Sequence, residues 1–187
     1  MLNNYELILR DLGLKIFPEI TLVSSFFNEE ANIQNFWSQI KKLEKMLNIV
    51  EIIFVNNASS DNTLKILKTI EKKDYRVKVI SNNSPSNYSQ GFANGIKNSN
   101  SQYTLITHSD CQYNLDEAIR YWLEIIYKKN VILNKNDNTV FSIRLNRPIH
   151  LRINTFLNCS LTRFFLFQGR YIDFFSQPKI ILTSLIK

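Results

Sequence analysis

The sequence predicts an α/β protein with a mostly parallel sheet flanked by helices. Short apolar runs rich in β-branched residues alternate with amphipathic segments, and about 20 residues connect one run to the next. That alternation is typical of βαβ units with right-handed crossovers. The chain has only four glycines and four prolines, which argues against a turn-rich all-β protein. Its 187 residues suit one domain, which we place at residues 20–187 after an N-terminal extension of residues 1–19.

Five apolar, β-prone runs are the predicted strands. They are ITLVSSFF (20–27), EIIFV (51–55), RVKVI (76–80), YTLIT (103–107) and TVFSI (139–143). Each run is short enough for a strand, and polar residues follow it. Ligands of parallel sheets bind at the carboxyl ends of the strands, so these polar segments are where we expect the chemistry.

Helices are predicted between these strands. The first has apolar residues on one face at spacings of three and four: Ile33, Phe36, Trp37, Ile40, Leu43 and Leu47. We expect Asn28, Glu29 and Glu30 to start it, by capping and by favourable charge. Further helices are predicted from about Asn62 to Lys72, shortly before residue 103, and from about Leu115 to Lys128.

Composition excludes several classes of protein. The two cysteines, Cys111 and Cys159, match no zinc-ligand spacing and no disulfide framework, which favours a reducing cytoplasm. The N-terminus carries acidic residues and no cleavable signal pattern. No uncharged apolar run approaches the ~18–20 residues that cross a bilayer. We therefore expect a cytoplasmic protein that is soluble or lies on a surface.

The net charge of +7 is concentrated near the C-terminus. Residues 142–187 contain seven basic residues, seven phenylalanines and tyrosines, and one acid, Asp173. Such a segment suits phospholipid headgroups, a lipid-linked phosphate or nucleic acid. It lacks a nucleic-acid recognition motif, so we expect no nucleic-acid partner. A peripheral contact with the inner face of the cytoplasmic membrane is one interpretation, and an ordinary mixed surface over a Phe-rich core stripe is the other.

Three predicted strand ends carry candidate site residues. After the first strand, Phe27 could stack on a base and Glu29 could meet a ribose or base edge. After the second, the polar turn around Asn57 could hydrogen-bond a nucleobase. In that turn we expect Asp61 to cap the next helix, which is a structural role.

The fourth strand end reads Thr107-His108-Ser109-Asp110-Cys111-Gln112. The chain has no glycine-rich phosphate fingerprint, and a metal held by an acidic residue is the usual alternative. Oxygen ligands such as Asp110 and Gln112 suit Mg²⁺ or Mn²⁺ shared with a diphosphate. His108 stays open between a site residue and a structural histidine. Asp116 and Glu117 are expected to be first-turn helix charges.

These segments resemble a known family. FFNEE, VNNASSDNT, GFANGI and HSDCQ occur in the order and spacing of family 2 glycosyltransferases of GT-A fold, a Rossmann-like architecture. In that family the corresponding patterns are P-x-Y-N-E-E, V-D-D-G-S-x-D-x-T and D-A-D-x-Q. VFSIRLNRP and IDFFSQPK also resemble family segments, the latter in a branch similar to polyprenyl-phosphate sugar transferases. The likeness covers about residues 20–182, with the basic aromatic end of the chain expected to be helical.

The chain departs from the family pattern at several positions. Ser25 replaces the usual proline and Phe27 the tyrosine, while Asn56 and Asn57 stand where the family has aspartates. An asparagine cannot offer a carboxylate to a base N–H, although its carbonyl can accept. The chain also stops soon after QPK, where relatives continue, so we expect a domain shortened at its C-terminus.

The resemblance implies transfer of a sugar from a nucleoside diphosphate to an acceptor, with inversion. It assigns the donor diphosphate to Asp110 with a divalent ion, the nucleoside to Phe27, Glu29 and Asn57, and the acceptor or leaving phosphate to Arg144 and Arg147. Asp173 is either a general base for an acceptor hydroxyl or the salt-bridge partner of an arginine. The acceptor would be a polyprenyl phosphate or a surface glycan. The alternatives are an inactive shortened paralogue that binds nucleotide and a basic membrane-binding module.

Overall fold

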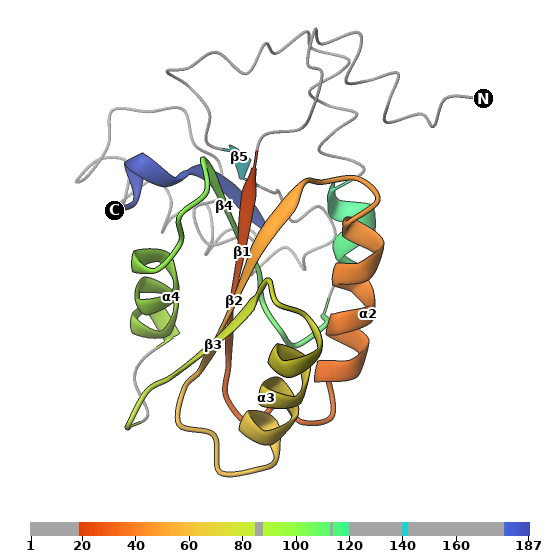
Figure 1. Ribbon diagram of the computed structural model, residues 1–187, viewed down its shortest axis with the longest axis vertical. Helices are drawn as coiled ribbons and strands as arrows, with labels where there is room; N and C mark the ends of the chain where they lie inside the picture. The colour runs from red at the N-terminus through yellow and green to blue at the C-terminus, as the bar shows by residue number, and fades with distance from the viewer. Residues whose placement is uncertain (1–18, 85–87, 113, 120–139, 142–177) are drawn as a thin grey trace, which may run out of the picture.

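The structure, a computed structural model, describes residues 19–84, 88–112, 114–119, 140–141 and 178–187 (Figure 1). The strands are β1 (Ile20–Phe26), β2 (Ile49–Asn56), β3 (Val77–Ser81), β4 (Tyr103–Ile106), β5 (Val140–Phe141) and β6 (Lys179–Leu182). The helices are α2 (Ile33–Leu43), α3 (Thr63–Lys73), α4 (Tyr88–Lys97) and the 3₁₀ turn η1 (Thr183–Leu185). A further helix begins at Leu115 and is described as far as Ile119.

The strands form one sheet in the order β3-β2-β1-β4-β6-β5. β1 pairs in parallel with β2 and β4, and β2 pairs in parallel with β3. β6 runs antiparallel to both of its neighbours, so it is the one reversed strand among those described. The α/β class and the mostly parallel sheet predicted from the sequence are confirmed. Because the parallel strands share a direction, the loops after β1, β2 and β4 gather at one edge of the sheet.

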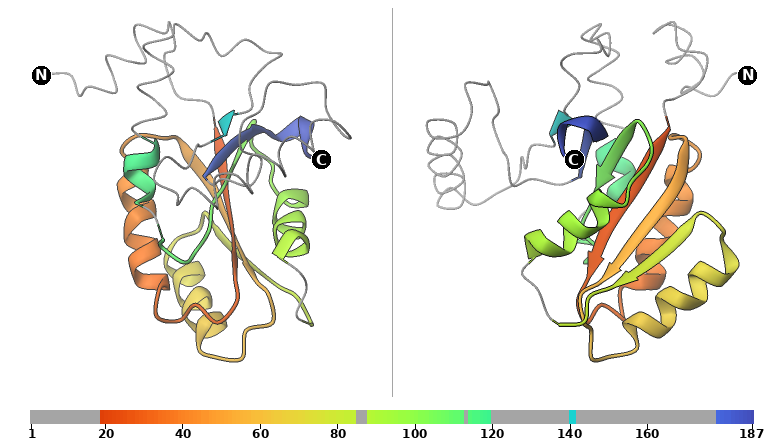
Figure 2. Two further views of the ribbon diagram at one scale, coloured as in Figure 1. Left: turned by 180° about the vertical axis from the view of Figure 1, so that it is seen from behind. Right: turned by 60° about the vertical axis from the view of Figure 1, so that its left-hand side comes forward.

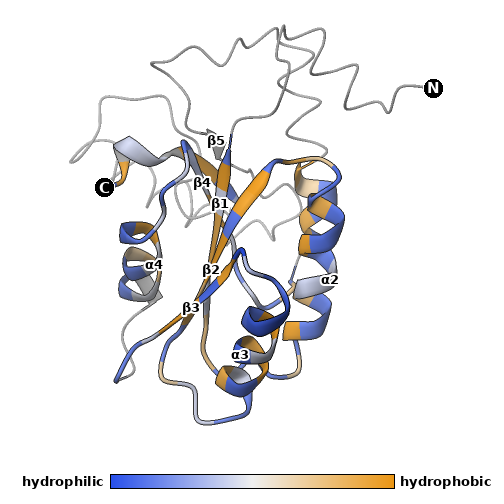
Figure 3. Cartoon of the chain, in the orientation of Figure 1, coloured by the Kyte–Doolittle hydropathy of each residue, from blue (hydrophilic) through white to orange (hydrophobic). Residues whose placement is uncertain are grey.

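Helices cover both faces of the sheet. α2 and α3 lie on one face and α4 on the other, as two views show (Figures 1 and 2). The larger core packs Phe26, Phe36 and Phe54 between the sheet and α2, with ring centroids 5.1–6.3 Å apart. A smaller core under α4 contains Val23, Val55 and Phe92. Figure 3 shows the strands largely apolar and the outer faces of the helices polar, as the periodicity predicts.

Two glycines of the GFANGI segment allow α4 to lie close to the sheet. A Cβ atom on Gly95 would collide with Val23 and crowd Val55, and one on Gly91 would meet Ser25 Oγ at 2.5 Å. The two glycines are four residues apart and therefore face the sheet together on α4. This close contact brings the polar residues of α4 near the ends of β2 and β3.

Each of the five predicted strands begins and ends within two residues of its predicted position, where the structure describes it. The predicted helix start is wrong. Asn28, Glu29 and Glu30 do not cap α2, whose N-cap is Asn32, with no side-chain cap and no acid in the first turn. These three residues instead form hydrogen bonds with the loop after β2, which compete with capping.

The predicted helical C-terminal segment is also wrong where the structure describes it. Residues 179–182 form strand β6. Ile180 and Ile181 are β-branched, which favours a strand, and they pair with the edge of β4 that β1 does not occupy. The predicted extension of residues 1–19, apart from Glu19, and residues 142–177 lie outside the described residues. In the part of the chain that the structure describes, no helix is long and apolar enough to cross a membrane.

Candidate functional site

Backbone strain gathers at the carboxyl edge of the sheet. Among the described residues, three that are not glycine have positive φ: Asn28 (54°), Ala58 (56°) and Cys111 (54°). Each follows a different parallel strand, namely β1, β2 and β4. Left-handed backbone costs an ordinary L-residue roughly 1–2 kcal/mol, and such strain concentrates at functional sites. The three loops predicted to carry the chemistry are therefore also the strained ones.

Hydrogen bonds tie the loop after β1 to the loop after β2. Asn28 accepts from Ser60 N through Oδ1 (2.9 Å), and Asn28 N donates to Ser59 Oγ (3.1 Å). Glu30 and Asp61 add reciprocal bonds. Glu30 N donates to Asp61 Oδ2 (3.2 Å), and Asn62 N donates to Glu30 Oε2 (2.8 Å). We call these the clasp between the two loops.

Asp61 performs the structural role expected of it. Its Oδ1 accepts from Thr63 N at 3.0 Å, which satisfies a donor at the start of α3. Burial opposes ionisation, but hydrogen bonds from Thr63 and Glu30 hold the pKa of Asp61 below its ordinary value. The clasp thus contains an ionised carboxylate. Of the two acids after β1, Glu30 belongs to the clasp and Glu29 does not.

The three predicted nucleoside contacts differ in exposure. Phe27 is 52% exposed, which is unusual for a phenylalanine and leaves a ring face open to stacking. Glu29 is half-buried, its backbone N bonded to Thr63 Oγ1 (2.9 Å) and its Oε2 accepting from Asn32 Nδ2 (2.6 Å). Asn57 is buried, and its Oδ1 accepts from Asn82 Nδ2 at 3.0 Å. The Asn57 side-chain carbonyl, which could accept from a base N–H, therefore already accepts a hydrogen bond from Asn82.

The loop after β4 lies beside the loop after β1. Ser109 Oγ donates to Ser25 O (2.9 Å), and the Cys111 thiol is 3.9 Å from Asn32 O. Burial, followed by the charges of Asp110 and Glu29, raises the pKa of Cys111. Both carboxylates are therefore close enough to this thiol to affect its ionisation. The structure thus brings together the ends of β1 and β4, as predicted.

Asp110, the predicted diphosphate or metal ligand, follows β4 at the carboxyl edge of the sheet. Its side chain is half-buried, and Oδ1 accepts from Gln112 N at 3.3 Å. Gln112 is exposed beside it. No group of three His, Cys, Asp or Glu that could hold a metal occurs among the described residues.

His108 and the helix after it have structural contacts. The ring of His108 meets the edge of Phe92 on α4, with centroids 6.2 Å apart. The backbone N of Leu115 donates to Gln39 Oε1 of α2 at 2.8 Å, in a buried contact. Asp116 and Glu117 follow in the first turn of that helix, as expected. Arg144, Arg147 and Asp173 lie outside the described residues.

Sequence reasoning missed Asn82 and Asn94. The sequence predicts a loop around Asn82 and a short helix around Asn94. In the structure Asn94 donates to Asn82, and Asn82 donates to Asn57. The available signal was topological. Residue 82 follows β3, so it must reach the same edge of the sheet as the ends of β1, β2 and β4.

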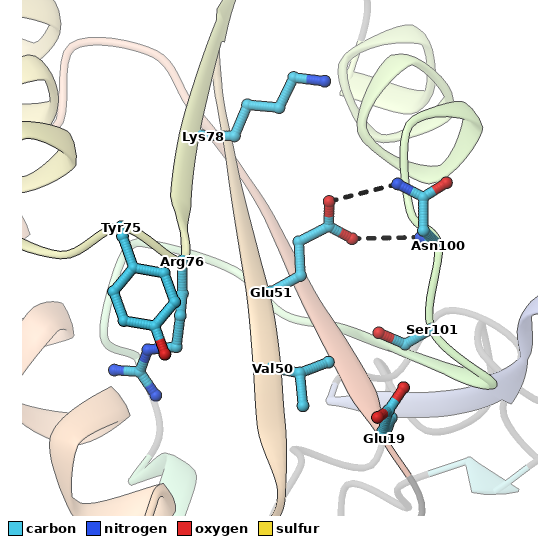
Figure 4. A pocket seen from close by; sticks show the side chains of 8 residues that line it. All are labelled: Glu19, Val50, Glu51, Tyr75, Arg76, Lys78, Asn100 and Ser101. Atoms are coloured by element: carbon cyan, nitrogen blue, oxygen red, sulfur yellow. Dashed lines mark hydrogen bonds between the residues drawn. The ribbon is translucent and has the colours of Figure 1, made fainter.

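A hollow of about 410 Å³ lies at the opposite, amino end of the strands (Figure 4). Glu51 points into it, and its carboxylate accepts from Thr21 Oγ1 (2.8 Å), Asn100 N (3.1 Å) and Asn100 Nδ2 (3.4 Å). The chain's own donors therefore satisfy this carboxylate. The hollow has no contact with the strained loops, so we place the candidate site at the carboxyl edge.

Comparisons with solved structures show which fold this chain shares. The structure resembles S. aureus TarS residues 1–349 in complex with UDP-GlcNAc, with a TM-score of 0.55, 17% identity, and coverage of 90% of this chain and 46% of that one. It also resembles the mannosyltransferase PcManGT from Pyrobaculum calidifontis in complex with GDP-Man and Mn²⁺, with a TM-score of 0.53, 14% identity and coverage of 79% and 44%. At these identities the likeness shows the fold, and the chain spans less than half the length of either protein. No curated protein matches the chain significantly.

The family comparison covers most of the sequence. Residues 21–175 match the family described as glycosyl transferase family 2. That range includes the loops after β1, β2 and β4, together with Arg144, Arg147 and Asp173. The GT-A fold expected from the motifs agrees with the structural neighbours. The chain belongs to glycosyl transferase family 2.

Proposed function

We propose that this chain binds a nucleoside-diphosphate sugar at the carboxyl edge of its sheet and transfers the sugar to an acceptor with inversion. One observation carries the proposal. The loops after β1 and β4 have an exposed aromatic ring, Phe27, and two carboxylates, Glu29 and Asp110, at the strand ends of a parallel sheet. Family membership supports the reaction class, and structural neighbours in complex with UDP-GlcNAc and GDP-Man support the donor class.

The proposed donor site divides between nucleoside and diphosphate. Phe27 stacks on the base, Glu29 accepts from the ribose hydroxyls, and Asn57 lies at the base edge. Asp110 and Gln112 face the diphosphate and would hold Mg²⁺ or Mn²⁺ together with it. When bound, such an ion would neutralise the charge that builds on the departing diphosphate. The complex of PcManGT with Mn²⁺ supports a divalent ion.

The acceptor side of the proposal rests on the sequence. Arg144 and Arg147 suit a phosphate through planar bidentate hydrogen bonds. Asp173 would act as a base for a hydroxyl acceptor, whereas an ionised phosphate acceptor would need none. The basic and aromatic composition of residues 142–187 favours a polyprenyl phosphate over a surface glycan. It also favours peripheral contact with the cytoplasmic face of a membrane.

Nucleotide binding with and without metal tests the proposal. Thermal unfolding of the wild-type chain should shift upward with UDP or GDP plus Mn²⁺, because a ligand that binds only the folded state stabilises it. Asp110→Asn should remove that shift and leave the melting temperature without ligand unchanged, since Asp110 is at a strand end outside the core. Glu117→Gln, at an exposed helix position, is the matched control and should keep the full shift.

Activity then separates transfer from binding alone. A panel of nucleotide sugars with a short polyprenyl phosphate should give product for one donor, and Asp110→Asn should give none. Nucleotide binding without transfer to any acceptor would support the inactive paralogue. A wild-type chain that binds no nucleotide, with or without metal, would contradict the donor site itself.

A further inference from the structure

Strand β3 forms one end of the described sheet, because β2 is its only neighbour in the strand order (Figure 2). In a parallel pair, alternate residues of a strand turn their backbone groups toward the partner strand. Ile52 N of β2 donates to Arg76 O at 2.9 Å, so Arg76 and each second residue after it face β2. Val77, Val79 and Ser81 therefore turn their N–H and C=O groups outward. We call this side of the strand the free edge of β3.

Two side chains of α3 cover the middle of the free edge. Glu71 Oε1 accepts from Val79 N at 2.7 Å, and Lys68 Nζ donates to Val79 O at 3.4 Å. Lys68 Nζ also donates to Glu71 Oε2 at 2.7 Å, so the two carboxylate oxygens have different donors. Burial opposes ionisation of Glu71, but the hydrogen bonds from Lys68 and Val79 lower its pKa below the ordinary value. A charged carboxylate therefore occupies the place that the backbone of a further strand would take.

We infer that Glu71, held by Lys68, prevents a second copy of this chain from adding to the sheet through β3. An uncovered edge strand offers backbone donors and acceptors to any other strand, and proteins often block such edges with charged side chains. Here the block consists of hydrogen bonds to the edge backbone itself. Without the Glu71 carboxylate, Val79 N loses its acceptor, and a strand of a second copy can supply another. This inference does not depend on the proposed function.

The free edge of β3 is self-complementary, which favours a second copy as the occupant. β3 runs from Val77 to Ser81, so Val79 is its middle residue. In an antiparallel pair about a two-fold axis, the two Val79 residues would exchange N–H···O bonds, and Ser81 N of each copy would meet Val77 O of the other. Lys78 of one copy would lie directly across from Ile80 of the other, so no like charges would oppose each other.

Glu71→Ala tests the inference, and sedimentation equilibrium of the full chain measures the dimerisation constant. In wild type, each copy must give up one charge-assisted hydrogen bond before β3 can pair, and each such bond is worth at least about tenfold. Two copies lose one bond each, so Glu71→Ala should dimerise about a hundredfold more strongly than wild type. Glu71→Gln keeps an amide oxygen that can accept from Val79 N, so it should stay within about tenfold of wild type.

Two further variants show whether the association uses β3. Glu117→Ala removes the same charge at an exposed position of another helix and should dimerise no more than wild type. Ser81→Pro, added to Glu71→Ala, removes an outward N–H group at an exposed residue and should restore the wild-type constant, because proline at a free edge blocks pairing. Thermal unfolding confirms that each variant is folded.

Hydrogen exchange at the Val79 amide gives a readout that does not need the proline variant. In Glu71→Ala, protection of this amide should increase with protein concentration, because only the dimer supplies an acceptor. A folded Glu71→Ala variant that dimerises no more than Glu117→Ala overturns the inference. So does association that a folded Ser81→Pro variant does not reverse, or that leaves the protection of Val79 independent of concentration.

Discussion

The two edges of the sheet use polar groups in opposite ways. At the amino edge, Lys41, Glu44, Asp74 and Arg76 form a compact ion-pair cluster, which we call the amino-edge cluster. Arg76 Nη2 lies 2.6 Å from both Glu44 Oε1 and Asp74 Oδ2, and Lys41 Nζ lies 2.9–3.0 Å from the same two acids. Arg76 Nη1 also donates to Ile49 O, at the start of β2.

At the carboxyl edge, Glu29 and Asp110 have no comparable cations among the described residues. Among the described residues, neither Glu29 nor Asp110 forms a salt bridge, and the backbone nearby is strained at Asn28, Ala58 and Cys111. Two cations neutralise two anions at the amino edge, whereas the carboxylates of the proposed donor site have no such partners among the described residues. Under the proposed function, stability and nucleotide binding depend on opposite ends of the same strands, and variants should separate the two properties.

The largest effect on stability is expected from Arg76→Met. The substitution keeps an unbranched apolar stem but removes the guanidinium, so only Lys41 remains to neutralise Asp74 and Glu44. We expect the free energy of unfolding to fall by about 2–3 kcal/mol, below the 3–5 kcal/mol typical of fully buried pairs because this cluster is partly exposed. Urea titration measures the change. Nucleotide affinity of the folded variant should not change.

Lys68→Met is the matched control for that variant. It breaks the exposed pair between Lys68 and Glu71 on α3, which should contribute well under ~1 kcal/mol. If both variants lose the same stability, the amino-edge cluster is no more important than an ordinary surface pair. If Arg76→Met weakens nucleotide binding instead, the separation between the two edges is wrong.

Low pH should lower the free energy of unfolding by protonating Asp74 in the amino-edge cluster. Hydrogen bonds from Arg76 hold the pKa of Asp74 well below its ordinary value, against the opposing effect of burial, and Lys41 adds to the shift. A depressed pKa in the folded state gives stability that is present above the unfolded value, about 3.9, and is lost as the pH falls toward the folded value. The free energy of unfolding of wild type should exceed that of Asp74→Asn by about 1–2 kcal/mol at pH 6. This difference should begin to shrink below about pH 4 and should disappear only near the much lower folded pKa of Asp74. Parallel curves would exclude Asp74 as the source.

The clasp should matter more for binding than for stability. Asn28→Ala removes two hydrogen bonds to Ser60 and leaves an alanine at positive φ, whereas Asn28→Gly removes the same bonds without the strain. We expect losses of about 1–1.5 kcal/mol for alanine and under ~1 kcal/mol for glycine. Nucleotide affinity should fall about tenfold in both, because Phe27 and Glu29 adjoin Asn28. Equal affinity in wild type and both variants would leave the clasp a structural feature only.

The smallest effect is expected from Ala58→Gly. Alanine at a φ of 56° is strained, and glycine relieves that strain while adding entropy to the unfolded chain. The net gain should be under ~1 kcal/mol, measured by thermal and urea unfolding. A loss of stability would show that the turn around Ala58 is not under strain.

Much of this fold could be predicted from the sequence because its signals are local. The runs that became β1, β2 and β4 are continuous and apolar, as buried parallel strands require, and Phe36 and Ile40 mark the buried face of α2 at helical spacing. The residues directly after those strands, Phe27, Asn57 and Asp110 among them, could be placed at one edge by topology alone. Exposure of Phe27 and the engagement of Asn57 could not.

What was missed depends on contacts between distant segments. Glu30 looks like a helix-start acid, but Asp61 and Asn62, about 30 residues away, offer its backbone and side chain better partners. The hydrogen bond between Asn94 and Asn82 needs α4 to lie close to the sheet. Gly91 and Gly95 permit that close approach, which the spacing of apolar residues does not predict. Strand β6 was missed because its pairing partner, β4, precedes it by roughly 70 residues.

The place of β6 has a consequence for how the protein is made. β6 separates β5 from β4, and Thr183 at its end forms a buried hydrogen bond with Thr104. During synthesis, β4 is complete roughly 70 residues before β6, which corresponds to ~4–14 s at 5–20 residues per second. Throughout that interval the free side of β4 offers backbone donors and acceptors to any other strand. The nascent chain is therefore most open to mispairing after β1 to β4 have been synthesised, and a ribosome that pauses between residues 107 and 178 would prolong that exposure.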